Sequence, residues 1–102
     1  MTELTGAKFD YFVKEGVVLV DFFAEWCMPC LTMAPIVDEL SEKFRGKIKF
    51  GKVNVDDNRD LAKKFEVSSF PNFLVFKDGK VVERFLGAMS KEEMEEKLGK
   101  FA

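Results

Sequence analysis

The stretch VVLVDFFAEWCMPC, residues 17–30, decides the fold of this chain of 102 residues. Its first eight residues form a nearly continuous run of β-branched and aromatic side chains, which is typical of a strand buried on both faces. Both cysteines of the chain, Cys27 and Cys30, follow where a helix is expected to begin. A buried strand that leads into a helix indicates an α/β fold, in which functional sites lie beyond the carboxyl ends of the strands.

Amphipathic segments predict four helices, because their apolar residues recur at the spacing of one helix face. These are a helix that ends before Gly16, a helix that follows the cysteines and ends at Gly46, a short helix over residues 58–66, and a last helix that begins at Ser90. Ser90 and Glu93 match the capping-box pattern of a helix start. Pro35 lies inside the second helix, where we expect a kink because proline removes one backbone donor.

Strands are expected at residues 17–24, 48–55, 73–77 and 80–86. Asp78-Gly79 separates the last two strands and favours a tight two-residue hairpin turn. A strand–helix–strand unit early in the chain and a hairpin late in it imply one central mixed sheet flanked by helices. This sheet is expected to be parallel in its first half and antiparallel in its C-terminal hairpin.

The composition fits one small domain with a single core, since 47% of the residues are hydrophobic. A formal net charge of -2, from 16 basic and 18 acidic residues, leaves no basic excess for a phosphate backbone, so we expect no nucleic-acid partner. The polar N-terminus lacks the pattern of a secretory signal, and no apolar stretch is long enough to span a bilayer. We therefore expect a protein without a membrane partner.

The spacing of the cysteine pair favours redox chemistry. Residues three apart in a first helical turn are close enough for a disulfide that opens and closes with little backbone movement. No Ser, Thr, Asp or Asn precedes Cys27, so the free N–H groups and the positive end of the helix dipole can stabilise a thiolate there. We expect Cys27 to be the nucleophile and Cys30, one turn deeper, to resolve a mixed disulfide.

Three other uses of the pair compete with redox chemistry. A zinc site needs four ligands, and the chain has no His and no further Cys, so only a metal shared between two chains would fit. A structural disulfide across so small a loop would stabilise the chain little. Two inert buried thiols do not suit an exposed helix start. Redox chemistry is the interpretation that the context favours.

The segment VDFFAEWCMPC resembles the active-site signature of the thioredoxin family. KVNVDDN, SFP, FKDGK and the Gly87-Ala88 pair also recur in family order, so the likeness extends over nearly the whole chain. The resemblance implies a single thioredoxin domain over residues 1–102 that reduces protein disulfides in the cytoplasm, as a monomer and with no bound cofactor. It also implies two kinds of partner, a separate disulfide reductase and disulfide-containing client proteins.

Asp21 interrupts a strand that otherwise reads as buried on both faces, where an unpaired carboxylate is costly. Lys52 shares a face with apolar residues of the next strand, so we expect a buried Asp21–Lys52 ion pair. The resemblance implies that Asp21 exchanges a proton with Cys30 through water. A purely structural ion pair, or an Asp at a strand edge, is the alternative.

The resemblance also implies that Pro71 has a cis peptide bond and faces the cysteines, where the backbone before it pairs with substrate as an added strand. An apolar docking surface around Cys27 is expected from six residues, namely Trp26, Met28, Pro29, Phe70, Gly87 and Ala88. The alternative for Pro71 is an ordinary strand-start proline.

This sequence departs from the family pattern at three places. Met28 replaces the usual glycine between the cysteines, Phe23 replaces a second tryptophan, and the proline lies in SSFPNF. These changes bear on redox poise and on client choice. Two alternative functions are a glutaredoxin-like reductase fed by glutathione and a non-catalytic thioredoxin-fold binding module. Trp26 and Pro29 differ from the glutaredoxin Cys-Pro-Tyr-Cys form.

Overall fold

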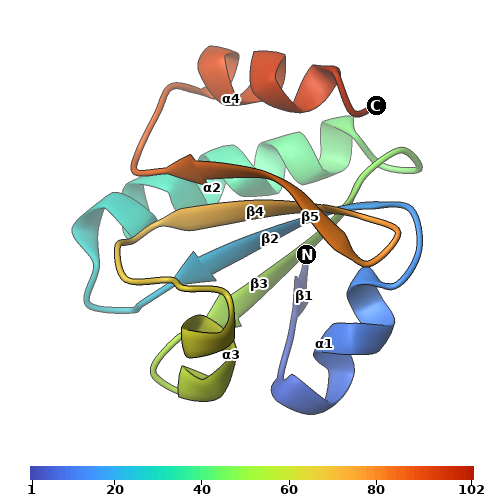
Figure 1. Cartoon of the computed structure of the whole chain (residues 1–102). Helices are drawn as coiled ribbons and strands as arrows, with labels where there is room; N and C mark the ends of the chain where they lie inside the picture. Colours follow the sequence, from blue (N-terminus) through green and yellow to red (C-terminus); the bar gives the residue numbers. More distant parts are fainter.

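The computed structural model describes residues 1–102 and places one sheet between two layers of helices (Figure 1). The elements along the chain are β1 (Thr2–Glu3), α1 (Gly6–Val13), β2 (Val17–Phe23), α2 (Met28–Lys43), β3 (Lys49–Asn54), α3 (Arg59–Lys64), β4 (Asn72–Lys77), β5 (Lys80–Leu86) and α4 (Lys91–Gly99). Helices α2 and α4 cover one face of the sheet, and α1 and α3 lie on the other side in Figure 1. None of the helices combines the length and the apolar character needed to cross a membrane.

The five strands follow the order β1-β3-β2-β4-β5. β3 pairs in parallel with β1 and β2, whereas β4 pairs antiparallel with β2 and β5. The predicted α/β class and the mixed sheet are therefore confirmed. Strand β1 was not predicted, because a strand of two residues has no alternation in its sequence. Backbone pairing with β3 holds β1 in the sheet. The Leu4 N–H continues this pairing by one residue, because it donates to the Lys52 carbonyl at 2.8 Å.

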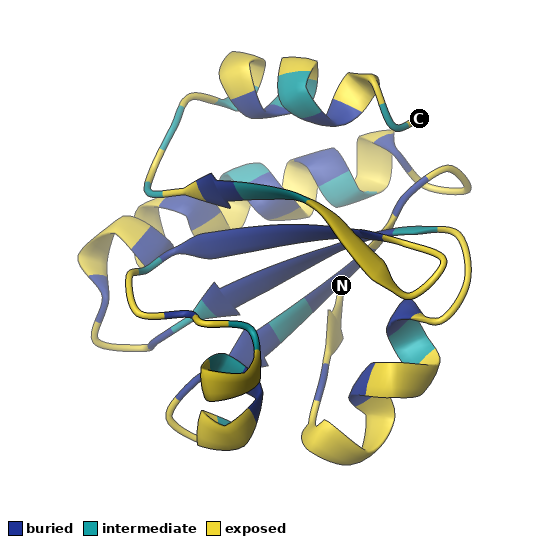
Figure 2. Cartoon of the chain, in the orientation of Figure 1, coloured by how far each residue is buried: buried dark blue, intermediate teal, exposed yellow.

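The central strand β2 explains why its sequence is apolar without alternation. Val18 and Val20 pack into the core on the side of α1 and α3, and Leu19 packs into the core on the side of α2 and α4. All three side chains are fully buried. Figure 2 shows the buried strands between the two helical layers. Because both faces are covered, the strand needs apolar residues at successive positions.

Local signals set the ends of several elements as expected. Asp78 and Gly79 have φ of 51° and 86°, the left-handed conformations that a tight two-residue hairpin requires. The Ser90 hydroxyl accepts a hydrogen bond from the Glu93 N–H at 3.1 Å and so caps α4. Pro35 lies inside α2, as predicted. The short helix and the second predicted strand are each trimmed at their ends, to α3 and β3 as given above.

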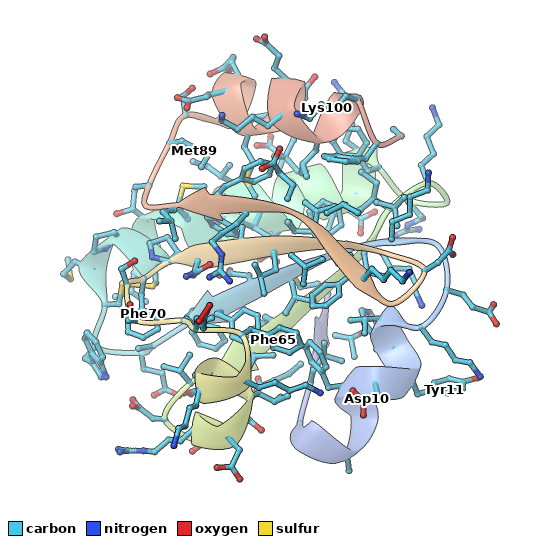
Figure 3. All side chains as sticks on the ribbon, in the orientation of Figure 1. Asp10, Tyr11, Phe65, Phe70, Met89 and Lys100 are labelled. Atoms are coloured by element: carbon cyan, nitrogen blue, oxygen red, sulfur yellow. A yellow bond between two sulfur atoms is a disulfide. The ribbon has the colours of Figure 1, made fainter.

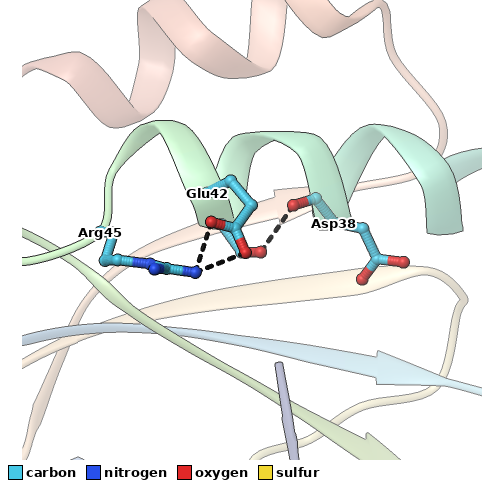
Figure 4. A network of polar contacts seen from close by, with 4 residues as sticks. Asp38, Glu42 and Arg45 are labelled. Atoms are coloured by element: carbon cyan, nitrogen blue, oxygen red, sulfur yellow. Dashed lines mark hydrogen bonds and ion pairs between the residues drawn. The ribbon is translucent and has the colours of Figure 1, made fainter.

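The C-terminal end of α2 lies at the opposite end of that helix from the cysteines. There the Arg45 guanidinium binds both carboxylate oxygens of Glu42, at 2.7 and 2.5 Å (Figure 4). The Ser41 hydroxyl donates to the Asp38 carbonyl at 2.6 Å. Arg45 and Glu42 are exposed, so this pair adds little stability.

Replacing Gly51 with alanine is expected to lower the free energy of unfolding by about 1–3 kcal/mol, the usual cost of overpacking a core. Gly51 lies on β3, and a Cβ added there would be 2.7 Å from Leu4 Cδ1 and 2.9 Å from Phe12 Cε2. Urea unfolding measures the change. Gly6→Ala, where a Cβ has no neighbour within 4 Å, is the control, and equal stability of the two variants would contradict the prediction.

Candidate functional site

The two cysteines lie at the carboxyl end of β2, where residues 24–27 lead into α2. They form a disulfide with a Cα–Cα distance of 5.2 Å, within the usual range for such bonds. The structure contains no group of three or more His, Cys, Asp or Glu side chains arranged to hold a metal ion. The pair is thus a redox-capable disulfide at the start of a helix.

Cys27 occupies the N-cap position of α2. Its Sγ accepts a hydrogen bond from the Cys30 N–H at 3.2 Å, so the sulfur takes the place of the missing Ser, Thr, Asp or Asn cap. This refines the expectation from the sequence, in which the helix start had no cap. The N–H group that binds the sulfur now would also stabilise a thiolate after reduction.

Both sulfur-bearing residues are nearly enclosed, whereas their neighbours are not. Cys27 and Cys30 are each 5% exposed, but Trp26 and Met28 are 66% and 69% exposed. Pro29, between the cysteines, is also exposed. A disulfide that reacts here therefore has to approach across a surface rich in large apolar side chains, which is typical of a protein-binding site.

Asp56 holds Trp26 in place and was not anticipated from the sequence. The indole N–H donates to Asp56 Oδ2 at 2.9 Å, and the ring packs edge-on against Phe70 with 5.7 Å between the ring centroids. Buried Asn54 supports the same loop, since its amide donates to Glu25 Oε1 at 3.2 Å and its oxygen accepts from the Asp56 N–H at 3.0 Å. The available signal was the position of Asp56 just after β3, which neighbours β2.

A second loop brings Pro71 to the same end of the sheet. The Phe70–Pro71 peptide bond is cis, and Pro71 is buried at the start of β4. Its carbonyl accepts a hydrogen bond from the Gly87 N–H at 2.9 Å, which ties the end of β5 to this loop. Ala88 follows and is exposed. Loops distant in sequence thus meet near the disulfide.

Asp21 is a buried carboxyl on β2, near the end of the strand that leads to the cysteines. It is 5% exposed, and its Oδ1 has no hydrogen-bond partner. Burial raises the pKa of Asp21 to about 7, because a charged carboxylate loses its hydration there. Lys52 lowers this pKa and Asp38 raises it, although neither outweighs burial.

A pocket of about 210 Å³ opens beside Asp21 and is lined by Cys30, Lys52 and Asp38 among others. The expected direct ion pair between Asp21 and Lys52 is absent, although the two residues are neighbours in the β2–β3 register. The Lys52 ammonium instead lies 5.7 Å from the centre of the Phe23 ring, in a cation–π contact. Lys52 acts on Asp21 through its charge alone.

The family profile described as Thioredoxin matches residues 1–100. The chain belongs to the thioredoxin family. Proteins called thioredoxin from Staphylococcus aureus strains Mu50 / ATCC 700699, MW2 and N315 are each 44% identical to it over 100 residues, which cover 98% of this chain and 96% of theirs.

The sheet and its flanking helices are therefore a thioredoxin fold. With a redox-active disulfide in a Cys-x-x-Cys motif, the protein is a thiol–disulfide oxidoreductase that acts on protein disulfides. The interpretation of the cysteine pair as redox chemistry is thereby confirmed. The family is the one that the active-site segment resembles.

Proposed function

We propose that the reduced protein donates two electrons to a client disulfide, with Cys27 as nucleophile and Cys30 as resolving thiol. The Cys27 thiolate forms a bond to one client sulfur, and the other client sulfur leaves and takes up a proton. Cys30 then loses its proton and attacks Cys27 Sγ, which releases the second client thiol and closes the Cys27–Cys30 disulfide. The observation that carries this assignment is the Cys27 sulfur at the N-cap, bound by a backbone N–H.

Asp21 is the proton acceptor for Cys30 in this proposal. The two residues line one pocket, whose volume is sufficient for water between them. A pKa of about 7 allows Asp21 to take up and release a proton near neutral pH, which suits a general acid–base group. Lys52, which lines the same pocket, keeps this pKa from rising further.

Client proteins dock on an apolar surface around the disulfide in this proposal. Its members are the six residues expected from the sequence, namely Trp26, Met28, Pro29, Phe70, Gly87 and Ala88, and Pro71 is added here because it directly follows Phe70. The exposure of Trp26 and Met28 and the packing of Phe70 on Trp26 support this role. An extended client segment adds as a strand to the backbone at Phe70, before Pro71.

The cycle needs a reductant, and we assign that role to a separate disulfide reductase of the kind that serves thioredoxins. The reactive group is the cysteine pair itself, so the reaction proposed here draws on no further cofactor. We also propose that residues 1–102 work as a single thioredoxin domain and as a monomer, in the cytoplasm, where reducing conditions favour the dithiol form.

Reduction of insulin disulfides, with dithiothreitol as electron source, tests the proposed docking surface. Trp26→Ala is expected to raise the KM for insulin about tenfold, because large aromatic side chains dominate protein interfaces. Reduction of a small aromatic disulfide should continue at the wild-type rate, since a small molecule needs little of this surface.

The control is Tyr11→Ala, which removes another exposed aromatic ring. Tyr11 lies on α1, away from Phe70 (Figure 3), and is 82% exposed. Its replacement should leave the KM for insulin unchanged. If Trp26→Ala and Tyr11→Ala behave alike, clients do not dock on the proposed surface.

A further inference from the structure

The segment over residues 65–72 positions Phe70 and Pro71. It runs from the C-cap of α3 to the first residue of β4, outside helix and strand for most of its length. Figure 3 shows Phe65 and Phe70 along this connection. Contacts that hold the two ends of this segment therefore also help to set the positions of Phe70 and Pro71 relative to the disulfide.

One side chain of β5 binds both ends of this segment. Arg84 is half-buried and lies opposite Leu74 of β4 in the hairpin register. Its Nη2 donates to the Phe65 carbonyl at 2.6 Å, and its Nη1 donates to Asn72 Oδ1 at 3.3 Å. A single planar guanidinium thus joins the first and the last residue of the segment to the edge strand.

The acceptors of Arg84 are neutral oxygens that need a partner. The Phe65 carbonyl lies at the end of α3, where carbonyls lack intrahelical donors and carry the negative end of the helix dipole. Asn72 is buried, so its amide oxygen is costly to leave unpaired. No carboxylate oxygen lies within 4.0 Å of the guanidinium. The Arg84 side chain therefore holds the Phe65 carbonyl and the Asn72 amide in place and forms no ion pair with an Asp or Glu.

The end of β5 supplies one more contact to the same segment. The Gly87 N–H donates to the Pro71 carbonyl at 2.9 Å, three residues beyond Arg84. Phe70, next to Pro71, packs against Trp26. Strand β5 and the Gly87 that follows it thus hold the segment at its start, at Pro71 and at Asn72, while the Phe70 ring packs against Trp26, next to Cys27.

We propose that Arg84 is a positioning residue for client docking. By joining Phe65 and Asn72, it holds Phe70 and Pro71 at the place where the client backbone binds. This inference rests on the docking role given to Phe70 and Pro71 under the proposed function. Arg84 acts through the segment, so its removal weakens client binding and leaves the chemistry of the cysteines unchanged.

Steady-state reduction of insulin and of a small aromatic disulfide by two Arg84 variants tests this proposal. Arg84→Met keeps the apolar stem but removes both hydrogen bonds, and should raise the KM for insulin about tenfold at unchanged kcat, because bonds from a charged donor are lost. Arg84→Lys keeps the charge but offers one compact donor in place of a fork, so its KM should lie between those of Arg84→Met and wild type. Both variants should reduce the small disulfide at the wild-type rate.

Arg45→Met is the matched control, because Arg45 is exposed at the far end of α2 (Figure 4). A stability loss in Arg84→Met with an unchanged KM would show a structural role only and overturn the proposal. An equal loss of rate with the small disulfide would overturn it as well, since Arg84 would then act on the cysteines.

Trp26→Ala, assayed in parallel, separates the positioning role of Arg84 from the docking surface itself. If it alone raises the KM, the docking surface stands and Arg84 has no part in it. If neither variant raises the KM, both are wrong.

Discussion

Cys27→Ser is expected to abolish turnover of protein disulfides, leaving only the background rate of the reductant. Serine has no thiolate at neutral pH, so no mixed disulfide with a client forms. Cys30→Ser is expected to behave differently. Its Cys27 can still attack, but no second thiol releases the product, so the variant accumulates as a covalent complex with the client.

Two measurements distinguish these outcomes. The insulin assay gives the turnover of each variant, and mass spectrometry under non-reducing conditions gives the mass of the trapped complex. Thr32→Ser, one turn along the same helix, keeps both cysteines and should retain full turnover. Turnover that persists in Cys27→Ser, or a trapped complex in Cys27→Ser rather than Cys30→Ser, would reverse the two roles.

Asp21→Asn is expected to stabilise the protein at about pH 8 by as much as about 4 kcal/mol, the free energy equivalent of the shift in pKa. The pKa of Asp21 is about 7 in the folded protein and 3.8 as its ordinary value. Between these values the folded state holds a proton that the unfolded state has released. The folded state of the wild type therefore loses stability as the pH rises through this window, and asparagine, which does not titrate, removes that loss.

Urea unfolding of the oxidised protein at about pH 4 and about pH 8 measures this effect. The difference between Asp21→Asn and wild type should be near zero at the lower pH, where Asp21 is protonated in the folded state and about half protonated in the unfolded state, and large at the higher pH. Asp10→Asn, on the exposed face of α1, is the control and should leave the pH dependence unchanged. A stabilisation of equal size at both pH values would mean that the carboxyl does not titrate as described.

The same variant tests the proton transfer assigned to Asp21. Asparagine cannot accept the Cys30 proton, so release of the reduced client should slow, while the first attack by Cys27 continues. Stopped-flow measurement of the two steps separates them. A release rate that matches wild type across the pH range would leave Asp21 with a structural role only.

The early strand and the cysteine pair could be predicted because their signals are local. β2 reads as buried from consecutive residues, and the three-residue spacing of Cys27 and Cys30 alone allows a disulfide in a helical turn. Burial of Asp21 followed from its place in that strand. The predicted ion pair with Lys52 was wrong, because the register that makes Asp21 and Lys52 neighbours does not set the direction of a long side chain.

By itself, the sequence determined the α/β class, the order of all elements except β1, the hairpin at Asp78-Gly79 and the reactive pair, since each depends on residues that are adjacent or one turn apart. Only the tertiary structure decided which loops meet around that pair. It brought Asp56 to the Trp26 indole N–H and Arg84 to the Phe65 carbonyl and the Asn72 side chain. The physical reason is that these contacts join residues far apart in the chain, so they exist only once β3 and β5 have taken their places in the sheet.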